Sequence, residues 1–385
     1  MSSQRTAPGL ITEQMMIDFN ITAVTVGLLI SIQFFVYTVL QIPMGILVDR
    51  YGPNLILISG AMLTGIGTII YSVSKLEFFL FFARILTGVG DATVWVSVVL
   101  ILGQWFTGKE FTRLIGIASL MGNMGYLMAT VPFSLLIDSI GWRLSFLSAG
   151  LLLCLFSIFL YIILIQNTKR KLFRMENIKR EKTWKIMRRI LSKRHAWALF
   201  FCHFGVVGAY VGFISSWGVP YAMNVYNMSR SDASQLMMIG LAGALIGSPL
   251  ASWIANSLQT IKKPYIIFHL LLLASWSVFL FFHGRPPFYL TMILFFIIGL
   301  AYGSNTLTFA IVRQSFPIKE AGIVSGYANT GGFLGAILLP SIFGKVLDHF
   351  AMISNNVIEG YFYGLITPVI FSIIGLLGVA FLSEK

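Results

Sequence analysis

Two residues of opposite charge, Arg84 and Asp91, lie inside an otherwise apolar run of the sequence. With Gly88 and Trp95 they follow the spacing i, i+4, i+7 and i+11, which predicts that all four share one face of a helix. A carboxylate in a low-dielectric medium is costly to ionise, whereas a nearby guanidinium favours its charged form. These opposing effects predict that Arg84 and Asp91 together take up and release a proton. A structural polar contact between neighbouring helices is the alternative.

A second charged pair, Asp49 and Arg50, lies in the stretch QIPMGILVDRYGPN between two apolar runs. Gly45 precedes the pair and Gly52 follows it. Glycine allows both close packing of helices and a tight turn, so we expect a short, closely packed connection here. A simple turn carrying one arginine is the alternative interpretation.

The composition of the chain limits where such pairs can lie. The 385 residues are 57% hydrophobic and 11% charged, with 14 acidic side chains, and their mean hydropathy is +0.84. This is too little polar surface for two or three soluble domains, and the apolar runs reach membrane-spanning length. The net charge of +13 lies in short loops between apolar runs and forms no basic stripe, which argues against a nucleic-acid partner. The two cysteines, Cys154 and Cys202, provide neither a disulfide framework nor a metal site.

Eleven apolar runs are long enough to cross a bilayer, which needs roughly 20 residues per helix. Because backbone polar groups inside a membrane must be satisfied within the segment, we predict an all-α polytopic membrane protein. The predicted spans are 22–47, 54–73, 78–105, 114–137, 144–166, 196–224, 233–255, 264–283, 288–311, 321–346 and 360–383.

The orientation follows from the positive charges in the loops. One set of alternate loops, together with the C-terminus, holds 20 lysines and arginines, whereas the other set holds four. The positive-inside rule therefore predicts that the first set and the C-terminus are cytoplasmic. Twelve of these basic residues lie in 167–195, where Trp184, Met187, Ile190 and Leu191 recur at helical spacing. We predict an amphipathic helix against anionic headgroups, with a flexible linker as the alternative.

The two sides of this linker resemble each other. GIASLMGNMG at 116–125 and GIVSGYANTGG at 322–332 align without a gap, and each is followed by a proline, Pro132 or Pro340. Such a repeat predicts two pseudo-symmetric six-helix bundles with a site near the bilayer midplane. We divide the chain into an N-terminal bundle (1–166), a basic cytoplasmic linker with an amphipathic helix (167–195) and a C-terminal bundle (196–385).

The first span is shorter than this scheme requires, because residues 1–20 resemble only the outer part of a span. Either the true start lies upstream or the protein is a shortened form with a truncated first helix. We favour the upstream start.

The stretch GILVDRYGPN resembles the loop signature that joins the second and third spans of the major facilitator superfamily. YTVLQIPMG before it, RILTGVGDA at 84–92 and GWRLSF at 141–146 are also similar to that superfamily. The resemblance covers nearly the whole chain and implies the major facilitator fold. It also implies a conformational latch at Gly45, Asp49, Arg50 and Gly52, with Asp49 near the N-terminus of a helix from the other half. Asn256 stands where the second half often has an aspartate, which implies a weaker latch there.

Polar and aromatic residues within the spans are candidates for solute binding, although such stripes more often serve packing. Arg5 is included because related carriers of organic anions place a substrate-binding arginine in the first span. We read GVP at 218–220 as loosening its helix, and Gly240, Gly243 and Gly247 as helix packing. The candidates are Arg5, Gln33, Tyr37, Trp95, Asn123, Tyr126, His203, Tyr210, Trp217, Tyr221, Tyr302, Asn305 and Asn329.

Together these features predict a secondary active transporter that moves a small polar solute, an organic anion above all, by alternating access. We expect proton coupling or exchange, no enzyme activity, no cofactor and no metal, because no motif for ATP use or covalent catalysis stands out. We expect a monomer in a bacterial inner membrane whose partners are the solute, protons and the lipid bilayer. An amino-acid or peptide carrier of the same superfamily remains open, as does a transport-inactive sensor or decayed carrier.

Overall fold

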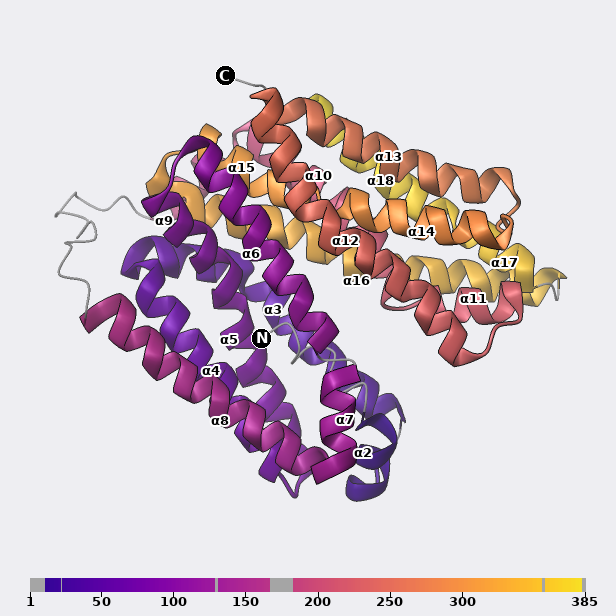
Figure 1. Cartoon of the computed structure of the whole chain (residues 1–385), viewed down its shortest axis with the longest axis horizontal. Helices are drawn as coiled ribbons and strands as arrows, with labels where there is room; N and C mark the ends of the chain where they lie inside the picture. Colours follow the sequence, from indigo (N-terminus) through magenta and orange to yellow (C-terminus); the bar gives the residue numbers. More distant parts are fainter. Residues whose placement is uncertain (1–10, 22, 129–130, 167–182, 355–356, 383–385) are drawn as a thin grey trace. The chain divides into compact units, whose positions relative to one another are not determined.

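Helices with short connections make up the described part of the chain, which comprises residues 11–21, 23–128, 131–166, 183–354 and 357–382 of a computed structural model (Figure 1). Ten of the helical segments in this part are long and apolar enough to cross a membrane. They are Ser31–Tyr51, Pro53–Val73, Glu77–Trp105, Trp142–Ile165, Arg194–Ile214, Asp232–Leu258, Lys262–Phe281, Phe288–Ser315, Ala321–Leu347 and Ile358–Ala380.

Ten of the eleven predicted spans correspond to these segments, and the predicted span 114–137 does not. Residues 129–130 of this span lie outside the described part, in which α6 (Gly108–Met128) precedes them and α7 (Val131–Ile140) follows them. α6 begins with Lys109, Glu110 and Arg113 and carries Asn123 further on, so its mean hydropathy is low for a span. The predicted span 196–224 is divided, because α10 ends at Ile214 and α11 begins at Gly218, where GVP was expected to loosen the helix.

The chain divides into two compact units. Unit 1 comprises residues 1–105, 121–188 and 318–326, and unit 2 comprises residues 106–120, 189–317 and 327–385. One short segment of each half of the chain therefore belongs with the other half. These segments are the start of α6, which belongs to unit 2, and the start of α16 (Ala321–Ser354), which belongs to unit 1.

In unit 1 the main packing is between α4 and α5, α4 and α8, and α3 and α5. Small residues allow the close approach of α4 to α5, since a Cβ atom on Gly90 would collide with the carbonyl oxygen of Gly60. The connection from α3 to α4 turns at Gly52, whose φ of 89° is unfavourable for other residues. The helices of this unit are α2 (Thr12–Phe19), α3 (Ala23–Tyr51), α4 (Pro53–Val73), α5 (Glu77–Trp105), the end of α6, α7 and α8 (Trp142–Tyr161), which continues as a π-helix at Ile162–Gln166.

In unit 2 the main packing is between α10 and α18, and between α12 and α14. A Cβ atom on Gly243 would collide with the carbonyl oxygen of Phe296, and one on Gly299 with that of Gly240. The predicted packing role of the glycines on α12 is thus confirmed. The helices are α10 (Arg194–Ile214), α11 (Gly218–Tyr226), α12 (Arg230–Leu258), α13 (Lys262–Phe281), α14 (Phe288–Tyr302), α15 (Asn305–Ser315), most of α16, α17 (Val357–Gly364) and α18 (Ile366–Ala380).

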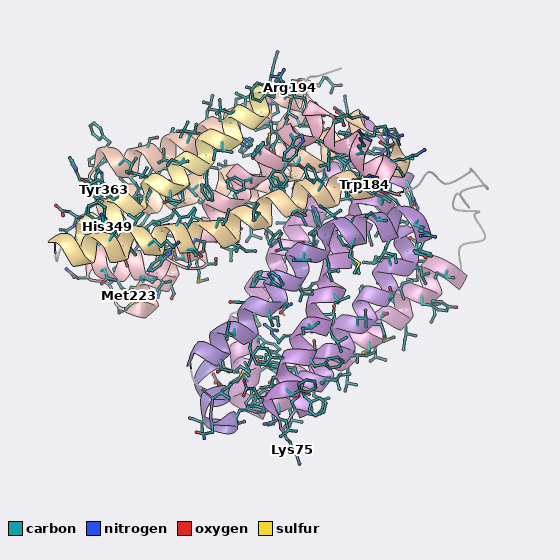
Figure 2. The ribbon with its side chains drawn as sticks, turned by 180° about the vertical axis from the view of Figure 1, so that it is seen from behind. Lys75, Trp184, Arg194, Met223, His349 and Tyr363 are labelled. Atoms are coloured by element: carbon teal, nitrogen blue, oxygen red, sulfur yellow. The ribbon has the colours of Figure 1, made fainter. Side chains whose placement is uncertain are left out.

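The basic segment contains one short helix, α9 (Thr183–Leu191), and its residues 167–182 lie outside the described part. Ile190 is fully buried, whereas Trp184 is 73% exposed (Figure 2). The apolar face of α9 is therefore covered in part by protein, and Trp184, Lys185 and Arg188 remain on the exposed side.

Candidate solute and proton site

The charged face predicted in the third apolar run lies on α5. Arg84 is 2% exposed and Asp91 is 1% exposed, and Gly88 between them is also buried. Trp95, one further turn along, is half-buried. Both charges thus lie inside unit 1, within a segment long and apolar enough to span a membrane.

α3 supplies the hydrogen-bond partner of Asp91. The side-chain amide of Gln33 donates to Asp91 Oδ2 at 2.8 Å, and Gln33 is 1% exposed. Gly88 makes this contact possible, because a Cβ atom there would come within 3.0 Å of the Gln33 carbonyl oxygen. The predicted candidates Gln33 and Asp91 therefore belong to one cluster. This cluster can form because Gly88 has no side chain.

Arg84 is positioned by neighbouring helices. Its Nε donates to the carbonyl oxygen of Leu29 on α3 at 3.1 Å. Its guanidinium carbon lies 5.5 Å from the ring centre of Tyr71 on α4, within the range of a cation–π interaction. Tyr71 was not predicted. It lies 13 positions before Arg84 on another helix, so no periodicity along α5 could have indicated it.

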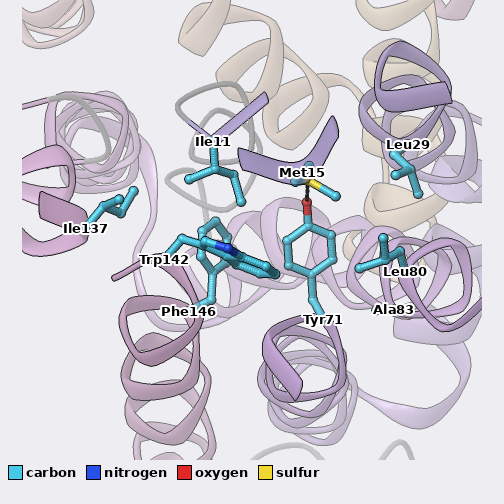
Figure 3. Packing of buried hydrophobic residues seen from close by; sticks show 9 residues of the cluster. All are labelled: Ile11, Met15, Leu29, Tyr71, Leu80, Ala83, Ile137, Trp142 and Phe146. Carbon is cyan, nitrogen blue, oxygen red and sulfur yellow. Dashed lines mark hydrogen bonds between the residues drawn. The ribbon is translucent and has the colours of Figure 1, made fainter. Parts of the chain in front are cut away.

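The hydroxyl of Tyr71 connects this cluster to α2, the described remainder of the predicted first span. It lies 2.7 Å from the sulfur of Met15, to which it donates a hydrogen bond (Figure 3). The ring packs against Trp142 and Phe146 of α8. Arg84 therefore borders the buried hydrophobic core of unit 1, of which Ile11, Met15, Leu29, Tyr71, Leu80, Ala83, Ile137, Trp142 and Phe146 are members.

The DRYG stretch, residues 49–52, contacts the segment of α16 that belongs to unit 1. Asp49 Oδ1 accepts a hydrogen bond from the amide of Gly322 at 3.0 Å, and Oδ2 accepts one from Ile323 at 2.9 Å. The carboxylate thus satisfies two amides at the positive end of a helix. A Cβ atom on Gly45 would lie 2.9 Å from the Ile323 Cα, so Gly45 allows the approach. Arg50 is exposed and, within the described residues, forms a cation–π contact with Tyr51 at 5.5 Å and no ion pair.

The corresponding position in unit 2 uses a different contact. Asn256 donates its side-chain amide to the carbonyl oxygen of Lys109, in the first turn of α6, at 2.9 Å. Ser119 and Ser248 lie 3.1 Å apart at their hydroxyl oxygens, further along the same helix pair. A neutral donor therefore stands here where Asp49 is an acceptor in unit 1.

A buried polar chain runs through unit 2. His203 Nδ1 lies 3.1 Å from the hydroxyl of Thr308, which lies 2.6 Å from the hydroxyl of Tyr265. The side chain of Asn329 also forms a hydrogen bond with His203. The predicted residues His203 and Asn329 are thus together, whereas Thr308 and Tyr265 were missed because single hydroxyl groups in apolar runs give no spacing signal.

The predicted aromatic residues of unit 2 pack on one another or on backbone groups. Tyr210 stacks on Tyr302 at 4.3 Å, Trp217 donates to the Pro340 carbonyl oxygen at 3.0 Å, and Tyr221 donates to that of Gly284 at 2.6 Å. Packing thus accounts for these contacts, and solute binding stays a prediction. Tyr37, Asn123 and Asn305 are buried, Arg5 lies outside the described residues, and so does the side chain of Tyr126.

Comparison with known proteins gives the family of the chain and solved structures of the same fold. The family model of the Major Facilitator Superfamily matches residues 1–340. A probable hexose phosphate transport protein of Chlamydia muridarum is 22% identical, with 96% of this chain and 85% of that protein covered. A probable L-galactonate transporter of Escherichia coli is also 22% identical, with 86% and 76% covered. The crystal structure of the Escherichia coli fucose:proton symporter has a TM-score of 0.78 at 14% identity, covering 100% of this chain and 97% of that one.

The match to the family model defines a polytopic transporter rather than an enzyme. The chain belongs to the Major Facilitator Superfamily, and it is an integral membrane protein that acts as a secondary transporter.

Proposed function

We propose that the protein carries a small organic anion, a sugar acid or a sugar phosphate, by alternating access and in exchange for or together with protons. The supporting observation is Arg84, an arginine 2% exposed inside a membrane span, next to a cluster that also buries Asp91. Ionisable groups at such depth are costly and mark solute or proton pathways. The guanidinium fork matches the geometry of carboxylate and phosphate groups, which makes an anion the best fit.

The solutes named in the descriptions of two relatives agree with this class of solute. One is described as a probable hexose phosphate transport protein and another as a probable L-galactonate transporter. Both solutes combine an anionic group with several hydroxyl groups. Gln33, Tyr37 and Asn123 are the polar residues that we propose for hydroxyl recognition, because each is buried and belongs to the same unit as Arg84.

We assign the proton to Asp91. The amide of Gln33 donates to Asp91 Oδ2, and a hydrogen bond of this kind is stronger to a charged carboxylate than to a protonated one. A protonated Asp91 would no longer attract the guanidinium of Arg84, leaving the arginine to a solute anion. We further propose a monomer in a bacterial inner membrane with a cytoplasmic C-terminus.

Uptake into proteoliposomes tests this function. We expect the purified protein to accumulate labelled L-galactonate or glucose 6-phosphate, and not glucose. Arg84→Gln should lower the uptake rate at least tenfold, because it removes the anion partner. Lys75→Gln, which removes an exposed charge outside the spans, is the matched control and should leave the rate unchanged. If the wild-type protein moves neither anion, or Arg84→Gln matches the control, the proposed solute class is wrong.

A further inference from the structure

We propose that Tyr71 is a positioning residue for Arg84. The ring of Tyr71 holds the Arg84 guanidinium in the orientation that receives a solute anion. This inference rests on the proposed function of Arg84. Tyr71 lies at the far end of α4 from the DRYG stretch, and no motif in the sequence assigns it a role.

Two contacts restrict the Arg84 side chain from different helices. The Leu29 carbonyl oxygen accepts a hydrogen bond from Arg84 Nε at 3.1 Å, and the Tyr71 ring centre lies 5.5 Å from the guanidinium carbon of Arg84. Tyr71, like Arg84, is only 2% exposed, so water competes little for the charge. A cation–π contact is strongest when both partners are desolvated in this way.

The side chain of Tyr71 is itself held by three contacts. Its hydroxyl donates to Met15 Sδ at 2.7 Å, and its ring meets Trp142 edge-on at 6.1 Å and Phe146 at 5.3 Å (Figure 3). Trp142 is fixed in turn, because its indole nitrogen donates to Asp18 at 3.0 Å. A ring packed so closely presents a fixed face to the guanidinium.

The C-terminal end of α4, where Tyr71 lies, is also secured. Arg143 donates to the carbonyl oxygens of Ser72 and Ser74 at 3.1 and 2.7 Å, next to Tyr71 in the sequence. The same arginine lies 3.4 Å from Asp18 of α2. Helices α2, α4 and α8 therefore fix the position of the ring, α5 carries the guanidinium that the ring orients, and α3 carries the Leu29 carbonyl oxygen that accepts from Arg84.

Orientation matters because an arginine binds an anion through two parallel N–H groups. Holding the fork in the binding geometry beforehand lowers the ordering cost of solute binding. Loss of the ring should therefore weaken solute binding more than it slows the conformational change. The signature of a positioning role is thus a raised KM with a nearly unchanged maximal rate.

The experiment compares three variants in proteoliposomes with labelled L-galactonate and glucose 6-phosphate as probes. Tyr71→Phe keeps the ring and removes the hydroxyl, and Tyr71→Leu removes the ring. Phe268→Leu is the matched control: Phe268 is 2% exposed, as Tyr71 is, but it lies on α13 of unit 2 and is not a member of the buried cluster around Tyr71.

We expect Tyr71→Leu to raise KM by about 3- to 30-fold, the range of a desolvated cation–π contact. Tyr71→Phe should restore KM to within about twofold of wild type, since the ring face remains. Phe268→Leu should lower the melting temperature by a similar amount to Tyr71→Leu without changing KM. Equal KM values for Tyr71→Leu and wild type, or equal increases in both leucine variants, would overturn the proposal.

A second measurement is independent of the solute. The melting temperatures of wild type, Tyr71→Leu, Arg84→Met and the double variant form a double-mutant cycle in detergent. We expect the double variant to melt higher than additive effects predict, because the two residues lose one shared contact. If the wild type transports neither probe, the proposed solute class fails while this cycle still decides the contact, and strict additivity would refute it.

Discussion

At the residue scale, Asp49 shows how a short motif gains a structural role. Its carboxylate accepts hydrogen bonds from two successive amides at the start of α16. An acidic group at a helix N-terminus contributes about 0.3–2 kcal/mol, enough to bias two states that differ by a few kcal/mol. We therefore propose that Asp49 holds this part of α16 in one of the states of the transport cycle.

The change that tests this proposal is Asp49→Asn. The amide keeps the shape of the side chain, but it loses the charge and one of the two acceptors. We expect uptake to fall several-fold while the amount of protein in the membrane stays the same, measured by immunoblot of membrane fractions. Asp232→Asn is the control, because Asp232 is an acidic residue near a helix N-terminus, in the first turn of α12, but is exposed. Unchanged uptake by Asp49→Asn would show that Asp49 marks the end of a span and has no role in the transport cycle.

The sequence predicted the polar residues of the candidate site better than the residues that position them. Arg84 and Asp91 stand out because charge is rare in an apolar run, and their spacing alone places them on one helix face. Gln33 was a candidate, but its hydrogen bond to Asp91 depends on how closely α3 approaches α5. Tyr71 and Thr308 are ordinary members of apolar runs, so only the packing of helices that are distant in sequence brings them to Arg84 and His203.

At the element scale, hydropathy located ten of the spans, and departures occurred where composition is mixed. The predicted span 114–137 is described only in part, as α6 and α7, and the start of α6 carries charges and packs in unit 2 by a small-residue contact. Gly116 lies there against Ser252, where a Cβ atom would not fit. α9 lies where the helical spacing predicted a helix, but Ile190 on its apolar face is buried against the protein.

The orientation of these elements remains a prediction from loop charge. Because 20 lysines and arginines lie in one set of loops and the C-terminus and four in the other, both the C-terminus and the 167–195 segment should be cytoplasmic. Green fluorescent protein fused after Lys385 should fluoresce in bacterial cells, and alkaline phosphatase fused there should be inactive. An active phosphatase at this position would reverse the assigned orientation.

At the scale of the whole molecule, the internal repeat predicted two related bundles, and the fold of the superfamily agrees with that. The repeat did not indicate that the starts of α6 and α16 group with the opposite half of the chain. Those segments contain the first five residues of each aligned sequence, GIASL at 116–120 and GIVSG at 322–326, whose glycines permit close packing with α12 and α3 respectively. Small residues repeated at corresponding positions thus indicated helix contacts as well as a relation between the two bundles.

Energy coupling is also a property of the whole molecule, and it gives the most direct test of the account through Asp91→Asn. The asparagine imitates a permanently protonated carboxylate, so it can no longer release a proton on one side of the membrane. In proteoliposomes, wild-type protein should concentrate labelled L-galactonate or glucose 6-phosphate when a pH gradient is imposed. Asp91→Asn should abolish this uphill uptake while exchange of internal for external solute continues. Undiminished, gradient-driven accumulation by Asp91→Asn would contradict the assignment of Asp91 as the coupling group.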